Sequence, residues 1–307
     1  MAYVYDMVII GGGPAGYSAA LYAARAGLDV VVLEKLSAGG QMALTHQVDN
    51  YPGFAQGIDG FTLGMQMQEG AERFGAKTEY AEVESLDLLA EPKRIETSEG
   101  TFYGRTVVYA AGAGPRELGL PEEKKLVGRG LHYCAACDGM FYKDKTVVVV
   151  GGGNSAVADA LILARIARKV ILVHRRDSLR AEKIYNKALA EAENLEFHWN
   201  SQVSQLLHEE KVHGVKLQNV ISGEQTVIPC DGVFVSIGRS PNTDLLRGQV
   251  NLTAEGYVAA GESCQTNIPG VFAAGDVRTK ALRQIVTAAA DGAVAVHYGQ
   301  EYLAGLQ

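Results

Sequence analysis

Apolar positions follow two different periods along this chain, and the first change of period comes near the N-terminus. Residues 6–10 form a short apolar run that ends in glycines, after which alanines at 19, 20, 23 and 24 recur at helical spacing. A second apolar run follows at 29–33. Short apolar runs suit buried strands and the alanine spacing suits a helix. We therefore predict a strand, a tight turn, a helix and a second strand.

The same order of elements returns 140 residues later. Residues 146–150 contain four consecutive valines, a glycine-rich turn follows, and small or apolar residues then line one face of a predicted helix at 156–164. The next apolar run is at 170–173. A strand as apolar as 146–150 suits the middle of a parallel sheet. Two such units predict an α/β protein with two Rossmann-like domains.

The remaining segments predict smaller elements. Residues 58–74 favour an amphipathic helix, and three short alternating runs after it favour a small antiparallel layer. Ser222-Gly223 is a plausible hairpin turn. The other expected ranges are the layer at 77–83, 86–89 and 94–97, a strand at 106–110, hairpin strands at 218–221 and 225–228, a strand at 270–274 and a final helix at about 282–298.

Two glycine- and proline-rich segments, 111–116 and 238–243, mark the expected crossings between domains. A chain of 307 residues is long enough for two domains. The segment after the second crossing is too short to form its own domain, so it must join an earlier one. We expect one domain at 1–114 and 243–307, interrupted by a second at 115–242.

A nucleotide-binding fingerprint, Gly-Gly-Gly-Pro-Ala-Gly, starts at residue 11 in the first predicted turn. Gly11 permits the turn, Gly13 lets the backbone approach a pyrophosphate, and Gly16 lets helix and strand pack closely. Free amides at the helix start attract phosphates. Glu34 ends the next strand 23 residues after Gly11, where an acid can bind a ribose. This arrangement predicts a dinucleotide site rather than an ordinary glycine turn.

The second turn has a matching fingerprint from Gly151, with Ala156 in place of the third glycine. Its second strand ends in His-Arg-Arg-Asp at 174–177, with Arg180 shortly after, so cations replace the acid. Guanidinium groups can pair bidentately with a 2′-phosphate. A solvated basic face is the alternative, but the register within the fingerprint favours an NADPH site.

Between the fingerprints lies a C-x-x-C pair, Cys134 and Cys137. Two thiols at this spacing can form an easily reduced disulfide or half of a zinc site. Because Cys230 and Cys264 stand singly, nothing completes four zinc ligands, and we expect no metal. Those two cysteines are expected to be inert buried thiols.

Composition narrows the classes of partner and compartment. With 28 basic and 35 acidic residues, the chain is an improbable ligand for nucleic acid. Its N-terminus lacks the pattern of a signal peptide, and no apolar run is long enough to span a bilayer, so no membrane association is expected. A reducing, cytoplasmic setting favours a working redox pair over a structural disulfide.

Taken in order, these motifs resemble those of the low-molecular-weight thioredoxin reductases over essentially the whole chain. The matching segments are GGGPAG at 11–16, GGQ at 39–41, VDNYPGF at 48–54, CAACDG at 134–139, GGGNSA at 151–156, HRRDSLRA at 174–181, and GVFAAGDV with RQ at 283–284. The resemblance implies FAD in the outer, discontinuous domain, NADPH in the inserted domain, which also carries the dithiol, and a homodimer. The fold expected is a three-layer ββα architecture in each domain.

The resemblance also implies residue roles. Cys137 would face the flavin, Cys134 would attack the disulfide of a thioredoxin or thioredoxin-like protein, and Asp138 would act as acid and base. His132 lies near the thiols, and a structural role is expected for it. The cofactor residues implied in the outer segments are Gly11, Gly13, Pro14, Ala15, Gly16, Glu34, Gly39, Gly40, Gln41, Asn50, Val83, Ala111, Gly112, Gly275, Asp276, Arg283, Gln284 and Ile285. Those in the inserted segment are Gly151, Gly153, Asn154, Ser155, Ala156, His174, Arg175, Arg176 and Arg180.

Other functions stay open at this point. The reductase component of a peroxidase system shares this core but carries an N-terminal thioredoxin-like extension, and here Met1 lies ten residues before the first fingerprint. A non-catalytic, flavin-bound redox sensor could use the dithiol only to switch conformation. A ferredoxin-dependent relative would lack the second fingerprint, and an NADPH-to-ferredoxin reductase would not need Cys134 and Cys137.

Overall fold

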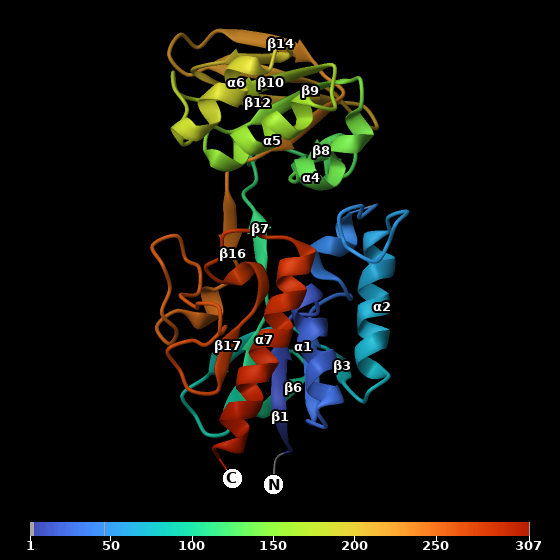
Figure 1. Ribbon diagram of the computed structural model, residues 1–307. Helices are drawn as coiled ribbons and strands as arrows, with labels where there is room; N and C mark the ends of the chain where they lie inside the picture. Colours follow the sequence, from blue (N-terminus) through green and yellow to red (C-terminus); the bar gives the residue numbers. More distant parts are fainter. Residues whose placement is uncertain (1–2, 46, 307) are drawn as a thin grey trace. The chain divides into compact units, whose positions relative to one another are not determined.

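A computed structural model describes residues 3–45 and 47–306 of the chain (Figure 1). The chain forms two compact units. The first combines the residues up to Gly114 with those from Ser240 onward, and the second runs from Pro115 to Arg239. The break between Arg239 and Ser240 lies inside the segment 238–243.

The first unit is built on a sheet in the order β3-β2-β1-β6-β5-β4, with β17 also paired to β6. The central strand β1 pairs in parallel with both β2 and β6. Burial on both faces explains why these strands are continuously apolar. The parallel strands here are β1 (Val4–Ile10), β2 (Val30–Glu34), β6 (Gly100–Tyr109) and β17 (Val271–Ala273).

One part of the predicted antiparallel layer was wrong. The strand β3 (Lys77–Tyr80) pairs in parallel with β2 and extends the main sheet. The physical reason is the helix α2 (Gly60–Glu72), which precedes β3 and supplies the crossover that parallel pairing requires. The antiparallel layer consists of β4 (Val83–Asp87) and β5 (Lys93–Thr97) beside the long strand β6.

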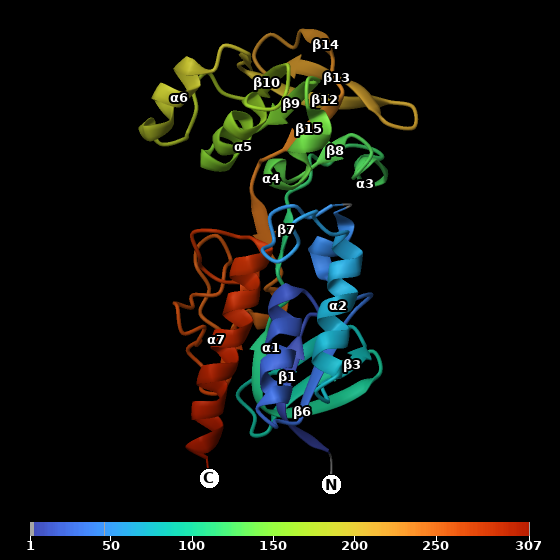
Figure 2. The ribbon, with the colours of Figure 1, turned by 45° about the vertical axis from the view of Figure 1, so that its right-hand side comes forward.

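Two helices of the first unit, α1 (Pro14–Arg25) and α7 (Ile285–Ala304), pack against each other (Figures 1 and 2). They approach closely because Gly292 has no side chain, since a Cβ there would overlap the carbonyl oxygen of Ala15. Ser18 Oγ donates to the carbonyl oxygen of Ala289 at 2.6 Å. The small residues of α7 thus let it pack closely against α1.

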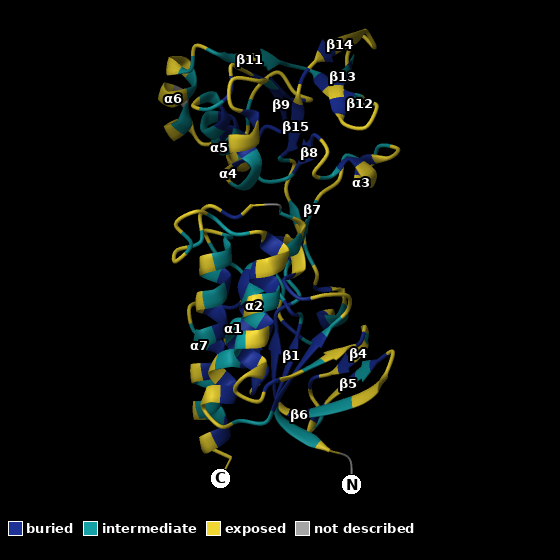
Figure 3. Cartoon of the chain, turned by 90° about the vertical axis from the view of Figure 1, so that its right-hand side faces the viewer, coloured by how far each residue is buried: buried dark blue, intermediate teal, exposed yellow. Residues whose placement is uncertain are grey.

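The second unit contains a five-stranded parallel sheet in the order β11-β10-β9-β15-β8. The four-valine strand β9 lies at its centre, as predicted, and its valines are buried (Figure 3). The helix α5 (Asn154–Ala164) follows β9 and presents Ala156, Val157, Ala160 and Leu163 to the core. The strands are β8 (Leu131–His132), β9 (Thr146–Val150), β10 (Lys169–Val173), β11 (Leu195–His198) and β15 (Gly232–Val235).

An antiparallel sheet of three strands, β12 (Ser201–His208), β13 (Val212–Asn219) and β14 (Gln225–Pro229), completes the second unit. The predicted hairpin is therefore confirmed, but its turn is longer than two residues. Asn219 Oδ1 accepts from the amides of Ile221 and Ser222 and ends the strand early. Gly223, with φ of 77°, then reverses the chain.

The two crossings pair with each other as short strands, β7 (Ala113–Pro115) and β16 (Arg239–Pro241). On one side of this pair, the amide of Asn242 donates to the carbonyl oxygen of Gly112 at 3.0 Å. On the other, the amide of Arg116 donates to that of Gly238 at 3.0 Å. The short helices are α3 (Glu123–Leu126), α4 (Ala135–Asp138) and α6 (Asn186–Glu191). Within the described ranges, none of the helices has both the length and the apolar character of a bilayer span.

Candidate active site and nucleotide sites

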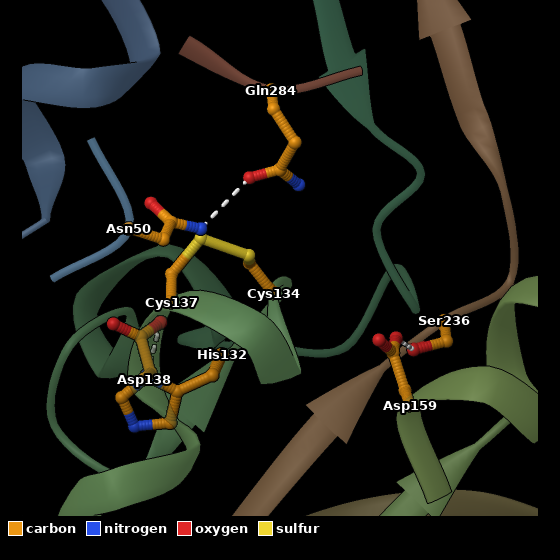
Figure 4. The surroundings of a disulfide bond; sticks show 8 residues. All are labelled: Asn50, His132, Cys134, Cys137, Asp138, Asp159, Ser236 and Gln284. Atoms are coloured by element: carbon orange, nitrogen blue, oxygen red, sulfur yellow. Dashed lines mark hydrogen bonds and ion pairs between the residues drawn. A yellow bond between two sulfur atoms is a disulfide. The ribbon is translucent and has the colours of Figure 1, made fainter. Parts of the chain in front are cut away.

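The predicted dithiol forms a disulfide in the second unit, with the Cα atoms of Cys134 and Cys137 5.3 Å apart (Figure 4). Cys134 directly precedes the short helix α4, which contains Cys137. Both cysteines are half-buried. The pair is thus held by local chain geometry, and neither sulfur is sealed in the core.

Asp138, the predicted acid, lies beside Cys137 and contacts a buried histidine. His132 Nδ1 and Asp138 Oδ2 are 3.0 Å apart, and His132 Nε2 is 2.7 Å from the Tyr142 hydroxyl (Figure 4 draws the first pair). The side chain of His132 is 6% exposed and that of Asp138 is 16% exposed. Sequence reasoning assigned His132 a structural role. The structure adds a polar contact to Asp138 that spacing alone could not reveal.

Aromatic contacts fix the ring of His132. It stacks on Phe234 of β15, with ring centroids 5.2 Å apart and planes 26° apart. The ring of Tyr142 meets it edge-on. Burial, followed by the negative charge of Asp138, raises the pKa of Tyr142 to about 12. Tyr142 is therefore a phenol at neutral pH and keeps a proton to donate.

Asp159 is a half-buried carboxyl that sequence reasoning missed. It lies on α5, and Ser236 Oγ, just after β15, donates to Asp159 Oδ2 at 2.5 Å (Figure 4). Burial raises the pKa of Asp159, while bonds from Ser236 and from the amide of Ala135 act against that rise. Asp159 therefore ties the loop of the disulfide to α5 and to the end of β15.

The first glycine turn has the backbone that its sequence predicts. Gly11 has φ of 104°, and a Cβ there would lie 2.6 Å from the Ala110 carbonyl oxygen. A Cβ on Gly16 would overlap the carbonyl oxygen of Gly11, so the third glycine allows close packing of helix and strand. Glu34 Oε2 accepts from the amide of Gly12 at 2.6 Å. The predicted ribose ligand is therefore held directly against the turn.

Several other expected residues gather around this turn. The amide of Gly39 donates to the Gly12 carbonyl oxygen at 2.8 Å, and a Cβ on Gly40 would lie 3.5 Å from Gly13 Cα. A Cβ on Gly275 would lie 3.0 Å from that of Ala15. The fingerprint, the 39–41 segment and the Gly-Asp turn at 275–276 are thus neighbours within one unit.

The remaining expected residues of the first unit have their own local partners. Asn50 Nδ2 donates to Gln284 Oε1 at 2.9 Å (Figure 4), and Arg283 Nε donates to the carbonyl oxygen of Asp276. Ile285 packs against the cluster of Met42, Val48 and Leu63. Ala111 and Gly112, between β6 and β7, accept through their carbonyl oxygens from Asn242, from Nδ2 at 2.8 Å and from its amide at 3.0 Å. Gln41 lies in the 40–44 turn and Val83 at the start of β4.

The second glycine turn is braced by the loop that follows β10. The amide of Arg180 donates to the carbonyl oxygen of Gly152 at 2.7 Å. Asn154, the first residue of α5, makes two bonds to Glu182, accepting from its amide at 2.8 Å and donating to Oε1 at 3.0 Å. The cation-bearing loop is therefore attached to the turn that it was predicted to serve.

His174 differs from the expectation that it adds a positive charge. It is buried, its pKa is lowered by burial and then by the three nearby arginines, and it is neutral at pH 7. Its ring occupies the space that a Cβ on Gly152 would need. Arg175, Arg176 and Arg180 are exposed. The positive charge at this site therefore comes from the arginines.

The two single cysteines are buried and free, as expected. Burial raises the pKa of Cys230 to about 12 and that of Cys264 to about 11, so both are protonated thiols at neutral pH. Within the described residues, no group of three or more His, Cys, Asp or Glu side chains is arranged to hold a metal ion.

The comparisons with known proteins agree with this geometry. Residues 5–292 match the family of pyridine nucleotide-disulphide oxidoreductases. The chain belongs to that family. A thioredoxin reductase of Listeria monocytogenes is 44% identical over 305 residues, covering 99% of this chain and 95% of the relative. One of Bacillus subtilis is 44% identical over 306 residues, covering 99% and 96%.

Solved structures agree as well. The crystal structure of thioredoxin reductase from Streptococcus pyogenes is 41% identical, with a TM-score of 0.89, and the match covers 98% of this chain and 99% of that one. The resemblance to low-molecular-weight thioredoxin reductases and the two-unit α/β fold are thereby confirmed. As an oxidoreductase of this family, the chain is a flavoprotein that uses a pyridine nucleotide.

The glycine turns of this family member leave room for such nucleotides. A Cβ built on Gly13 or on Gly153 meets no atom within 4 Å. Each of these glycines is also the N-cap of a helix, and no side chain caps the first amides of that helix. Open space before uncapped amides suits a pyrophosphate. The residues present therefore fit a dinucleotide at each turn.

Proposed function

We propose that this chain is an NADPH-dependent thioredoxin-disulfide reductase that contains FAD. The observation that carries the proposal is the Cys134–Cys137 disulfide with Asp138 directly after it, in a member of a pyridine nucleotide-disulphide family. The relatives named thioredoxin reductase support thioredoxin, or a thioredoxin-like protein, as the substrate. Bound FAD would supply two-electron transfer from the nicotinamide to the disulfide.

The two cysteines take different roles in this proposal. Cys137 receives electrons from the flavin side, and Cys134 attacks the disulfide of the protein substrate. Asp138 holds and releases the proton that the thiols need. A dithiol is suited to this work because exchange through a mixed disulfide passes two electrons without a radical step.

The nucleotides are assigned by charge. The first turn, with Glu34 held against Gly12, would bind FAD, because a carboxylate accepts hydrogen bonds from ribose hydroxyls. The second turn, with exposed Arg175 and Arg176, would bind NADPH, because a 2′-phosphate pairs with guanidinium groups. The proposed domains are then an FAD domain at 1–114 and 243–307 and an NADPH domain at 115–242. A homodimer in a reducing, cytoplasmic setting completes the proposal.

The test is a steady-state assay with NADPH and thioredoxin, using wild type, Cys134→Ser and Cys137→Ser. Both substitutions should abolish thioredoxin reduction while NADPH still bleaches the flavin absorbance. Cys230→Ser is the matched control, because that thiol is buried and protonated, and it should retain the wild-type rate. Thioredoxin reduction by both serine variants at the wild-type rate would refute the proposal.

The same assay separates the other functions considered above. A redox sensor would show NADPH oxidation by the flavin but no thioredoxin reduction in wild type. A peroxidase-system reductase would reduce its own disulfide partner faster than thioredoxin. A ferredoxin-dependent enzyme would not bleach with NADPH.

A further inference from the structure

We propose that His132 is a positioning residue for the dithiol reaction, in which its ring, anchored by the Tyr142 hydroxyl, holds the Asp138 carboxyl in place. This inference rests on the proposed function, in which Asp138 moves protons to and from the thiols. His132 touches neither sulfur in the contacts described, so its effect is exerted through Asp138.

The geometry forms a continuous chain of three polar groups. Asp138 Oδ2 lies 3.0 Å from His132 Nδ1, and His132 Nε2 lies 2.7 Å from the Tyr142 hydroxyl. Both ring nitrogens of a nearly buried histidine are thus satisfied, and one of the two partners is the carboxyl beside Cys137. The stack on Phe234 holds the plane of the ring.

The tautomer follows from the neighbours. Because the pKa of Tyr142 is raised to about 12, its hydroxyl is protonated and can donate to Nε2. A neutral ring that accepts at Nε2 carries its proton at Nδ1 and donates it toward Asp138. The Tyr142 hydroxyl then donates to His132 Nε2, and His132 Nδ1–H donates to the Asp138 carboxyl. This is the arrangement by which one group orients a second that does the proton transfer.

The other ionisable groups near this chain surround Tyr142. Cys230 and Asp231, just before β15, act on the Tyr142 hydroxyl electrostatically, and Cys230 is a protonated thiol. Lys145 Nζ lies 5.4 Å from the centre of the Tyr142 ring. Of these groups, Asp138 and the Tyr142 hydroxyl contact the histidine ring directly.

In the proposed reaction the dithiol reduces the substrate disulfide in two exchange steps. The Cys134 thiolate attacks one sulfur of the substrate disulfide, so a Cys134–substrate bond forms, the substrate disulfide breaks, and the departing thiolate takes a proton from Asp138. Asp138 regains a proton from the Cys137 thiol. The Cys137 thiolate then attacks Cys134 Sγ, re-forms the disulfide and releases the second substrate thiolate, which takes a proton from water. Two electrons leave the dithiol and reduce the substrate.

Two substitutions separate the two ring nitrogens. In His132→Asn the side-chain amide can donate near the position of Nδ1, so the bond to Asp138 is kept and the link to Tyr142 is lost. In His132→Gln the amide extends toward the position of Nε2, so the link to Tyr142 is kept and Asp138 loses its partner. We expect thioredoxin turnover to fall roughly tenfold or more in His132→Gln and less in His132→Asn, against the ~10²-fold or larger loss expected for Asp138→Asn.

The readouts distinguish positioning from packing. We expect kcat for thioredoxin to fall while its KM and the rate of flavin reduction by NADPH stay at wild-type values. The rate–pH profile should also change in both variants, because each replaces the group that lies against the Asp138 carboxyl. Tyr142→Phe, which keeps the aromatic packing, should change the pH profile without the kcat loss of His132→Gln.

His208→Asn is the matched control, because His208 also pairs with a carboxylate, Glu122, at 3.1 Å but lies on β12. It should behave as wild type. Equal kcat and an unchanged pH profile in His132→Gln, in protein with wild-type thermal stability, would overturn the inference, as would equal losses in His132→Gln and His132→Asn. Failure of wild type to reduce thioredoxin would instead refute the proposed function, so the two failures are distinguishable.

Discussion

The turn at Gly11 and the turn at Gly151 each follow an interior strand of a parallel sheet and open onto a helix. In both, the side chain at the end of the next strand lies against the middle glycine. Glu34 accepts the amide of Gly12, whereas the buried ring of His174 fills the space beside Gly152. The backbone is shared and the charge is not, and the proposed assignment of FAD to one turn and NADPH to the other depends on this difference.

This comparison also explains the second glycine of each turn. A Cβ on Gly12 would lie 3.0 Å from Glu34 Oε2, and one on Gly152 would overlap the His174 ring. Gly12 and Gly152 must lack a side chain because Glu34 and His174 occupy the space beside them. Gly13 and Gly153, the next residues along the chain, face open space. The glycines of one fingerprint therefore serve different purposes.

The largest effect is expected from alanine at the open position of each turn. Gly13→Ala should fold, because its Cβ meets no protein atom, but its methyl group would enter the space proposed for a pyrophosphate. We expect FAD affinity to fall on the order of 10²-fold, since misplacement by about 1 Å has effects of that size. Gly153→Ala should keep FAD and lose NADPH affinity. Flavin content and NADPH titration measure the two outcomes.

These two variants also test which nucleotide binds at which turn. If Gly13→Ala lost NADPH affinity and kept its flavin, the two nucleotides would be assigned to the wrong turns. Circular dichroism should show wild-type folding in both, which separates loss of a ligand from loss of structure.

A smaller effect is expected from the arginines that distinguish the second turn. Arg175→Ala and Arg176→Ala should each raise KM for NADPH about tenfold or more, because a hydrogen bond to a charged group is worth ~1.5–3 kcal/mol. KM for NADH should stay the same, since NADH has no 2′-phosphate. Arg165→Ala, an exposed arginine at the end of α5, is the matched control. Equal changes for NADPH and NADH would contradict this assignment.

The smallest effect concerns His174 and pH. Its pKa is lower in the folded protein than in the unfolded chain, so the unfolded state binds the proton more readily, and stability is lost as pH falls through about 6.5. We expect the thermal midpoint of wild type to decrease on acidification. The thermal midpoint of His174→Gln should decrease less than that of wild type, because glutamine takes up no proton in this pH range. The difference between the two midpoints should therefore narrow on acidification. A constant difference from pH 7 to lower pH would show that His174 is not responsible.

The sequence was most informative where local physics decides the structure. Apolar runs located the central strands, and glycine spacing located both turns, because these depend on neighbouring residues. The pairing of Lys77–Tyr80 was mispredicted because alternation cannot distinguish a parallel from an antiparallel edge strand, whereas the preceding helix does so.

Contacts that join distant segments could not be predicted from the residues alone. The Asp159–Ser236 bond spans 77 positions, and nothing in the spacing of either residue points to the other. The His132–Asp138 contact is closer in sequence, but the side chains meet only because α4 turns the chain back on the end of β8. Burial also decides that His174 is neutral, which its position among arginines does not reveal.

The paired crossings have a consequence for how the chain could be cut. Because Gly112 is bonded to Asn242 on one side and Arg116 to Gly238 on the other, each unit is already closed at the point where the other interrupts it. Excising 115–239 would leave two ends that a very short linker could rejoin. The excised piece would have adjacent termini, which is the requirement for a circular permutant.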